Sequence, residues 1–509
     1  MFKKIAEQIE MIQHRQILCL VLIGICGIII RLVYFPYDIP LSLDGLLYFW
    51  YAADTSTLGH LPQNYTFPNN LWPLFISPFF YMLKSNNFLD YMYLQRLLSI
   101  SISIITIVPV YFLCRHFFDK QYAIIGVVLF VFEPRIIQNS MLGLTEPLSI
   151  LFGTSTLALF FSKKMKYVYS SFATLALFAL TRYEGLLLLI PITIMYFVRF
   201  GRNRHTAKRY ILAITIFVLV ITPITYSRIQ ITGRDGLTSH IFAGANVASS
   251  EIISDHATKK FSITNGLVTF GKLIGWSTVP IFILFVPFGV YTIFRNRNFL
   301  NYSIILSGIA LLIPSVYAYS RNIEEIRYLF IVFPLFSLIS LYMIKAVLDR
   351  SRWKKPIIIA LMVGVILSSG LFLNWKINNE HELEAVKIAK EVAKRTSVIN
   401  DYHPESVYLR TVGFEDQQDF AGKREIIHNK IKVLFAEKFS SLKEFLDYAK
   451  EQKLEFLLVD DQRSRPAFLK DILENESKYP FLTKEYDSGE HGFKYRVKIF
   501  RINYEMMSE

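Results

Sequence analysis

Hydrophobic runs of about 20 residues recur along the first 375 positions, and they constrain the fold more than any other feature of the chain. A run of this length crosses a membrane as a helix, because the hydrocarbon core offers no water to unpaired backbone groups. The chain is 53% hydrophobic, which is high for a soluble protein. We therefore predict a polytopic α-helical membrane protein with about 11 transmembrane helices, near residues 17–35, 97–114, 122–140, 145–162, 167–182, 185–200, 210–226, 277–294, 302–319, 327–345 and 356–374.

Positive charge is concentrated in the loops on one side of these predicted helices. Residues 1–375 hold 32 Lys and Arg against 16 Asp and Glu, and the short loops on the side of the N-terminus hold 20 of the basic residues but only 4 of the acidic ones. Loops rich in Lys and Arg remain cytoplasmic. The pattern predicts an integral membrane protein with its N-terminus in the cytoplasm and its C-terminal part outside. Because it accounts for the net charge of +14, we expect no nucleic-acid partner.

The predicted outer side contains two long connections, residues 36–96 and residues 227–276. Because long connections without a function are uncommon, we look for chemistry on this side. The stretch Asn69–Leu83 in the first connection is apolar, but it is short and interrupted by Pro73 and Pro78. We interpret it as an interfacial or re-entrant segment rather than a membrane span.

After Trp375 the pattern changes to that of a soluble α/β domain. Amphipathic helices are predicted at His381–Arg395, at Arg465–Glu474 and after the capping box Ser441–Glu444. Strands are predicted at Ser406–Val412 and Leu454–Asp460, followed by a hairpin of Lys484–Tyr486 with Tyr495–Ile502. The sequence thus predicts a transmembrane domain over residues 1–375, which includes both long outer loops, and a soluble extracytoplasmic α/β domain over residues 376–509.

Ionisable residues gather where the predicted helices reach the outer side. They come from five separate places in the chain: Asp44; Arg96; Glu146; Arg182 with Glu184; and Arg321, Glu324, Glu325 and Arg327. Charges at the edge of a membrane face water, a polar cavity, a ligand or one another. Each residue alone is compatible with a solvated loop, a snorkelling arginine or a structural ion pair. Together they predict a polar pocket that binds a charged ligand.

Arginines and carboxylates at such a place suit displacement at a lipid phosphate. The planar guanidinium matches the oxygens of a phosphate and keeps its charge. A nearby carboxylate can take the proton from an attacking hydroxyl group. The combination indicates a transferase that acts on a phosphate-activated lipid.

These motifs resemble those of the C-type glycosyltransferase superfamily, whose members use polyprenyl-phosphate sugars, and in particular its protein O-mannosyltransferase and aminoarabinose-transferase branch. The resemblance covers residues 1 to about 375. It rests on five features of the sequence: the acidic residue early in the first outer loop, the Arg-Leu-Leu-Ser start of the second span, the Thr-Glu-Pro-Leu turn, the Thr-Arg-Tyr-Glu-Gly turn and the segment Glu325–Phe330.

The resemblance implies a role for each matching residue. Asp44 would be the base that deprotonates the acceptor, and Glu146 would be the second acidic residue of the site. Substrate-binding residues would be Arg96, Arg182, Glu184, Glu325, Arg327 and Tyr328, with the two later arginines on the donor phosphate and the glutamates orienting them. The implied reaction inverts the anomeric carbon and releases polyprenyl phosphate, with no obligatory cofactor or metal. We expect a hexose such as mannose, and a prokaryotic cell membrane rather than the endoplasmic reticulum.

The acceptor class remains open at this point, because the first loop reads Leu-Trp-Pro-Leu at 71–74 where the protein mannosyltransferases have His-Pro-Pro. The acceptor is a protein, a glycan or a lipid. The alternatives are a glycan- or lipid-modifying transferase with the same donor, a transporter, and a non-enzymatic membrane assembly factor. A transporter is disfavoured because the charges lie at one rim rather than at mid-membrane.

Overall fold

The computed structural model describes residues 2–63, 65, 68–85, 87–253, 261–296, 298–396, 398–401, 432–436, 439–461 and 465–507. The chain divides into two compact units. The first unit consists of Met1–Phe35, Leu58–Pro78 and Gln95–Lys376. The second unit consists of Pro36–Thr57, Phe79–Leu94 and Ile377–Glu509.

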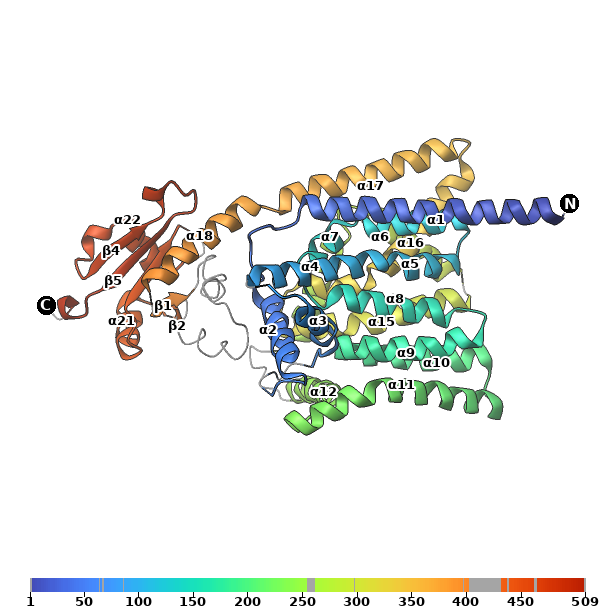
Figure 1. Ribbon diagram of the computed structural model, residues 1–509, viewed down its shortest axis with the longest axis horizontal. Coiled ribbons are helices and arrows are strands. Elements are labelled where there is room, and N and C mark those ends of the chain that lie inside the picture. Colours follow the sequence, from blue (N-terminus) through green and yellow to red (C-terminus); the bar gives the residue numbers. More distant parts are fainter. Residues whose placement is uncertain are drawn as a thin grey trace. The chain divides into compact units, whose positions relative to one another are not determined.

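The first unit is a helical bundle (Figure 1). Its elements, some of which extend into the second unit at one end, are α1 (Phe2–Val33), α3 (Leu71–Met82), α4 (Phe88–Ile105), α5 (Ile107–Arg115), α6 (Lys120–Val131), α7 (Pro134–Ser140), α8 (Glu146–Phe160), α9 (Met165–Thr181), η1 (Tyr183–Leu188), α10 (Leu189–Phe200), α11 (Arg204–Thr232), α12 (Thr238–Ile253), α13 (Ile263–Ser277), α14 (Phe285–Arg295), α15 (Phe299–Ser320), η2 (Ile326–Val332), α16 (Phe333–Arg350) and α17 (Lys354–Lys376).

Seven helical segments in the described part of the chain are long and apolar enough to cross a membrane, or eight if the bent pair α6–α7 is one span. They are Arg15–Val33, Phe88–Arg115, Tyr183–Phe200, Arg204–Thr232, Phe299–Ser320, Ile326–Arg350 and Lys354–Arg395. The bent pair changes direction by 57° at Phe132–Glu133. The predicted class, a polytopic helical membrane protein, is confirmed.

Helices occur at all eleven predicted positions, but two of them, α8 and α14, are shorter than the sequence indicated. α8 has 15 residues, α9 has 17 and α14 has 11. At roughly 1.5 Å per residue, even α9 is shorter than the hydrocarbon core of about 30 Å. The count of eleven spans therefore stays a prediction. The segment predicted to be interfacial or re-entrant forms α3, a 12-residue helix with Pro78 inside it.

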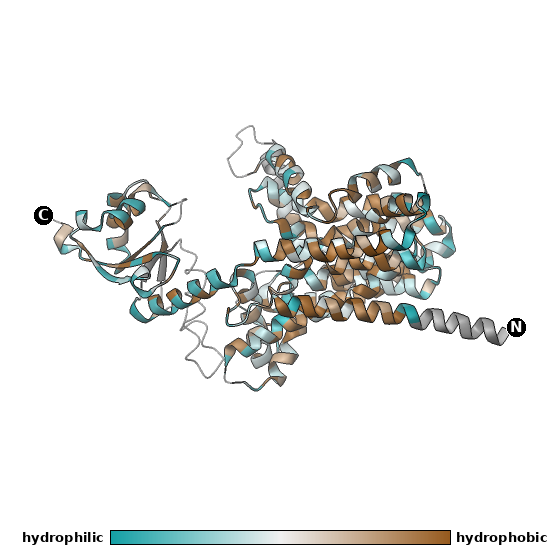
Figure 2. Cartoon of the chain, turned by 90° about the horizontal axis from the view of Figure 1, so that it is seen from above, coloured by the Kyte–Doolittle hydropathy of each residue, from teal (hydrophilic) through white to brown (hydrophobic). Residues whose placement is uncertain are grey.

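The apolar residues of the bundle face both its interior and its outside. Figure 2 shows long brown stretches on the helices of the bundle, with teal residues gathered at their ends. Many large apolar side chains on the outside are exposed, among them Leu219, Phe294 and Leu367. Exposed apolar surface on this scale suits contact with lipid. Inside the bundle, α14 and α16 pack so closely that a Cβ on Gly289 would lie 2.2 Å from the carbonyl oxygen of Ile339.

The second unit contains a five-stranded sheet with the strand order β2-β1-β3-β5-β4. β1 pairs in parallel with β2 and β3, whereas β5 runs antiparallel to β3 and β4. The strands are β1 (Val398–Asp401), β2 (Lys432–Phe435), β3 (Phe456–Asp460), β4 (Leu482–Asp487) and β5 (Val497–Ile502). The predicted hairpin and the predicted central strand are confirmed, and the predicted strand Ser406–Val412 lies outside the described residues.

Helices cover both faces of this sheet, because residues of β3 alternate between two hydrophobic clusters. Phe456 and Leu458 pack with α18 (Asn379–Arg395), whereas Leu457 and Val459 pack with α21 (Leu442–Glu451) and α22 (Ala467–Glu474). α21 begins as predicted, with Ser441 Oγ accepting a hydrogen bond from the backbone N–H of Glu444. The remaining short helices are η4 (Glu476–Lys478), η5 (Gly489–His491) and η6 (Glu505–Met507).

Part of the first long loop belongs to the second unit. Ile39 is buried in the same cluster as Ala389 of α18 and Val497 of β5. α2 (Leu43–Leu58) follows, and its aromatic residues Phe49 and Tyr51 are fully buried. Phe49 contacts Phe80 with their ring centroids 5.4 Å apart. These parts of the loop therefore contribute apolar side chains to the interior of the second unit.

Candidate active site

Glu146 and Arg182 are brought together by the antiparallel pair α8–α9. Glu146 is the first residue of α8, and Arg182 directly follows the last residue of α9. Because the two helices form a hairpin, the start of one lies beside the end of the other. The N-terminal end of a helix also carries partial positive charge, which favours a carboxylate at the position of Glu146.

A tight turn after α9 directs Arg182 and Glu184 to the same side. The backbone N–H of Gly185 donates to the carbonyl oxygen of Arg182 at 2.8 Å. The turn folds directly onto the end of α9, so a Cβ on Gly185 would lie 2.9 Å from the backbone nitrogen of Ala179. Glycine is the residue that fits this close approach.

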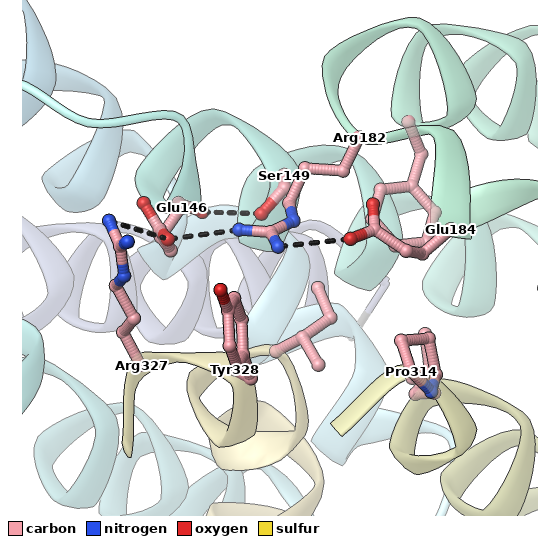
Figure 3. A pocket seen from close by; sticks show the side chains of 10 residues that line it. Glu146, Ser149, Arg182, Glu184, Pro314, Arg327 and Tyr328 are labelled. Atoms are coloured by element: carbon pink, nitrogen blue, oxygen red, sulfur yellow. Dashed lines mark hydrogen bonds and ion pairs between the residues drawn. The ribbon is translucent and has the colours of Figure 1, made fainter. Parts of the chain in front are cut away.

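Five charged residues form a continuous group, here called the glutamate–arginine cluster: Glu146, Arg182, Glu184, Glu325 and Arg327. Arg182 donates from Nη1 to Glu146 Oε1 at 2.9 Å and from Nη2 to Glu184 Oε1 at 3.1 Å (Figure 3). Nη1 of Arg327 lies 4.0 Å from the same Glu146 oxygen. Nε of Arg327 lies 3.6 Å from Glu325 Oε2. The structure thus joins five of the predicted site residues.

Tyr328 lies beside both guanidiniums. Its ring centroid is 5.6 Å from Cζ of Arg182 and 5.8 Å from Cζ of Arg327, which is within the range of cation–π contacts. Its hydroxyl points toward the row of ion pairs in Figure 3. The backbone around it is fixed by Ser315, whose hydroxyl donates to the carbonyl oxygen of Tyr328 at 3.0 Å. Tyr328 is therefore a sixth predicted residue in this group.

The cluster lies at a pocket that is lined by both charged and apolar residues. The side chain of Glu146 is 5% exposed and that of Arg182 15%. The second carboxylate oxygens, Oε2 of Glu146 and Oε2 of Glu184, are buried and accept no hydrogen bond from the described part of the protein. The pocket is lined by Glu146, Ser149, Phe178, Arg182, Glu184, Leu311, Pro314, Arg327, Tyr328 and Ile331. Ser149 and the apolar residues of this set were not predicted, because their side chains resemble ordinary helix core residues in the sequence.

The predicted substrate-binding role of Arg96 stays a prediction. Arg96 is buried and donates from Nε to the carbonyl oxygen of Met141 at 2.9 Å. Two neighbours hold the same loop, since Gln95 and Trp72 both donate to the carbonyl oxygen of Gly143, at 2.8 Å and 2.9 Å. Arg96 does not line the pocket of Glu146. In this structure it supports the loop that leads into α8.

Asp44 belongs to the second unit and lies in the first turn of α2. It is partly buried and is preceded by Leu43, whose φ angle of 48° is unusual for a residue with a side chain. Its role as a base stays a prediction. No group of three or more His, Cys, Asp or Glu that could hold a metal ion occurs among the residues described.

Two buried arginines in the first unit are structural and lie outside the cluster. Arg31 in α1 donates to the hydroxyls of Ser140 at 3.0 Å and Ser103 at 3.1 Å. Arg135 pairs with Glu133 and donates to the carbonyl oxygen of Trp276 at 2.7 Å. The buried position of Arg31 was not predicted from the sequence, although a charge within an apolar span is itself a signal of a specific partner.

Comparisons with known proteins agree with this architecture. A family model described as dolichyl-phosphate-mannose-protein mannosyltransferase matches residues 74–226. The oligosaccharyltransferase AglB from Archaeoglobus fulgidus, in complex with an inhibitory peptide and a dolichol-phosphate, has a TM-score of 0.57 at 11% identity, covering 88% of this chain and 69% of AglB. ArnT from Cupriavidus metallidurans, bound to undecaprenyl phosphate, has a TM-score of 0.56 at 10% identity, covering 94% of this chain and 97% of ArnT. No curated protein matches the chain in sequence.

The structural likeness extends over nearly the whole chain, whereas the family model covers about a third of it. Because the sequence identities are low, the structural comparison establishes the fold. This chain has the fold of the C-type glycosyltransferases that use polyprenyl-phosphate-linked donors, which confirms the resemblance drawn from its sequence.

Proposed function

We propose that the protein transfers a hexose, such as mannose, from a polyprenyl or dolichyl phosphate to an acceptor hydroxyl on the extracytoplasmic side of the membrane. The observation that carries this proposal is the glutamate–arginine cluster, in which Arg182 and Arg327 lie at a pocket at one end of the helical bundle. Guanidiniums at such a place suit a lipid phosphate. The lipid phosphates in the structures of AglB and ArnT support the same class of donor.

The proposed reaction is a single displacement at the anomeric carbon. The acceptor oxygen forms the new glycosidic bond, the bond from C1 to the phosphate oxygen breaks, and polyprenyl phosphate leaves. The proton of the acceptor hydroxyl goes to Asp44 as general base. Arg182 and Arg327 stabilise the charge that develops on the phosphate.

The distribution of charge supports an extracytoplasmic site. Glu146 begins α8, and the basic residues Lys163 and Lys164 follow its other end. The cluster and this basic loop therefore lie at opposite ends of the hairpin α8–α9. Since basic loops remain cytoplasmic, the pocket would open to the outside.

A second candidate has the same donor and a different acceptor. The likeness to ArnT covers 94% of this chain and nearly the whole of ArnT, whereas that to AglB covers 69% of AglB. The first loop, which reads Leu-Trp-Pro-Leu at 71–74, keeps a glycan or lipid acceptor beside a protein acceptor. Offering all three acceptor classes to the purified protein with one labelled donor distinguishes them.

The test is transfer of label from a radiolabelled polyprenyl-phosphate hexose in membranes that contain the protein. We expect Asp44→Asn to lower the rate by about 10²–10⁴-fold, as for loss of a general base. Asp38→Asn is the matched control, because Asp38 lies in the same loop and asparagine tolerates its φ angle of 61°. A fully active Asp44→Asn protein would show that another residue is the base.

A further inference from the structure

The glutamate–arginine cluster contains more negative than positive charge. Its three carboxylates, from Glu146, Glu184 and Glu325, face two guanidiniums, and both terminal nitrogens of Arg182 already donate to carboxylates. A phosphate held by Arg182 and Arg327 would satisfy these guanidiniums but would give the carboxylates no hydrogen-bond donor. The phosphate of the donor therefore cannot account for every contact that the pocket offers.

Two oxygens of the cluster lack the contacts that buried carboxylates require. Oε2 of Glu146 and Oε2 of Glu184 are buried and accept no hydrogen bond within the described residues. A buried acceptor without a hydrogen bond destabilises the folded protein, and more so if it is charged. Such an arrangement is typical of a binding site whose ligand completes the hydrogen bonds.

The two glutamates lie on either side of the Arg182 guanidinium (Figure 3). The same pocket has apolar walls from Phe178, Leu311 and Ile331. A ligand that fits it would both donate hydrogen bonds and present C–H groups. A sugar ring has both properties, because its hydroxyls donate and its carbons are apolar, whereas a phosphate dianion has no donor.

We propose that Glu146 and Glu184 bind the sugar of the donor through its hydroxyl or ammonium groups, and that the pocket accepts neutral or amino sugars and rejects acidic ones such as hexuronates. This inference rests on the proposed function. It assigns to Glu184 a direct contact with substrate in addition to its ion pair with Arg182. A hexuronate carboxylate would place a fourth negative charge beside Glu146 and Glu184, without a donor for their unpaired oxygens.

The test compares binding of two lipids, polyprenyl-phosphate hexose and polyprenyl phosphate without a sugar, to the purified full-length protein in detergent. Glu184→Gln should weaken binding of the sugar-bearing lipid about tenfold, as for one hydrogen bond to a charged group, and leave binding of polyprenyl phosphate within about twofold. Glu324→Gln, an exposed neighbour of the cluster, is the matched control. An equal loss for both lipids would overturn the proposal, because Glu184 would then act only through Arg182.

A second arm uses polyprenyl-phosphate hexuronate. The wild-type protein should bind it at least tenfold more weakly than the hexose lipid, and Glu184→Gln should narrow this gap. Equal binding of hexose and hexuronate lipids by the wild type overturns the inference about the sugar and leaves the proposed lipid-phosphate function standing. A wild type that binds none of the three lipids refutes both, and thermal unfolding of each variant verifies that it is folded.

Discussion

Nη1 of Arg182 lies 2.9 Å from Oε1 of Glu146, although the two residues are 36 positions apart in the sequence. The contact joins the start of α8 to the end of α9 at the pocket. It also places Glu146 within reach of Arg327, at 4.0 Å. One carboxylate oxygen thus links guanidiniums from two distant turns, and this link is what makes the cluster a unit.

A double-mutant cycle with Glu146→Gln and Arg182→Gln measures this link. We expect a coupling free energy of about 0.5–3 kcal/mol in unfolding, because each single change leaves a partly buried charge without its partner. Unfolding of the purified protein by denaturant in detergent gives the four free energies. Additive effects of the two changes would mean that the pair does not stabilise the fold.

Arg327→Ala should weaken use of the donor. Arg327 faces Glu146 and Tyr328, so its loss removes a cation from the pocket. We expect KM for the lipid-linked sugar to rise about tenfold or more, as for a lost charge-assisted hydrogen bond, with unfolding little changed. Arg321→Ala is the control, because Arg321 is exposed and lies outside the pocket. A change in stability alone would make Arg327 a structural residue.

Gly185→Ala tests whether the turn after α9 positions the cluster. The added methyl group would lie 2.9 Å from the backbone nitrogen of Ala179, so the turn must move. We expect a loss of about 1–3 kcal/mol in stability and a fall in transfer rate. Gly271→Ala in α13 serves for comparison, since nothing lies within 4 Å of its added Cβ. If both variants behave alike, the close approach at Gly185 is unimportant.

Structural features that depend on neighbouring residues were predicted from the sequence, whereas the individual partner of each charged residue was not. The capping box at Ser441 and the hairpin of β4 and β5 follow from residues that are near one another in the chain. The partner of Arg182 does not follow from neighbouring residues, because Glu133, Glu146 and Glu325 were equally available as carboxylates in the sequence. The selection depends on how α8 and α9 pack, which charge patterns do not encode.

Helix lengths and the environment of the first loop could not be predicted from the sequence either. Hydropathy does not distinguish α8, which is mostly buried among other helices, from a span that faces lipid. Ile39 gives no sign that it packs with α18, since one apolar residue in a loop has no periodic pattern. The hydrogen bond from Arg96 to a backbone carbonyl oxygen could not be predicted either, because backbone partners are not visible in the sequence.

The ion pair between Asp460 and Arg465 should stabilise the second unit. Both side chains are buried, and Nε of Arg465 donates to Asp460 Oδ1 at 2.6 Å. Burial alone would lower the pKa of Arg465, but its hydrogen bond with Asp460 and the charge of that carboxylate outweigh burial and raise it. Asp460→Asn should cost about 3–5 kcal/mol, because it leaves a buried cation. Asp461→Asn, at the exposed next position, should be neutral in the same thermal unfolding experiment.

Asp235 makes the stability of α12 depend on pH, and α12 contacts the turn that carries Arg182. It caps α12 by accepting hydrogen bonds from the backbone N–H groups of Thr238 at 2.8 Å and Ser239 at 3.0 Å. Burial alone would raise the pKa of Asp235, but the hydrogen bonds that it accepts from Thr238 and Ser239 hold it well below its usual value. α12 carries His240, whose ring centroid lies 5.6 Å from that of Tyr183 beside Arg182.

A lowered pKa in the folded state means that the cap stabilises α12 fully above the unfolded pKa of about 4. The stabilisation is lost as the pH falls from there toward the folded value. We expect hydrogen exchange of α12 amides, corrected for intrinsic rates, to be constant from pH 7 to pH 5 and faster below about pH 4. Asp235→Asn keeps a capping oxygen but cannot titrate, so its α12 should lack this acid-dependent step. An identical step in the variant would assign the effect to another group.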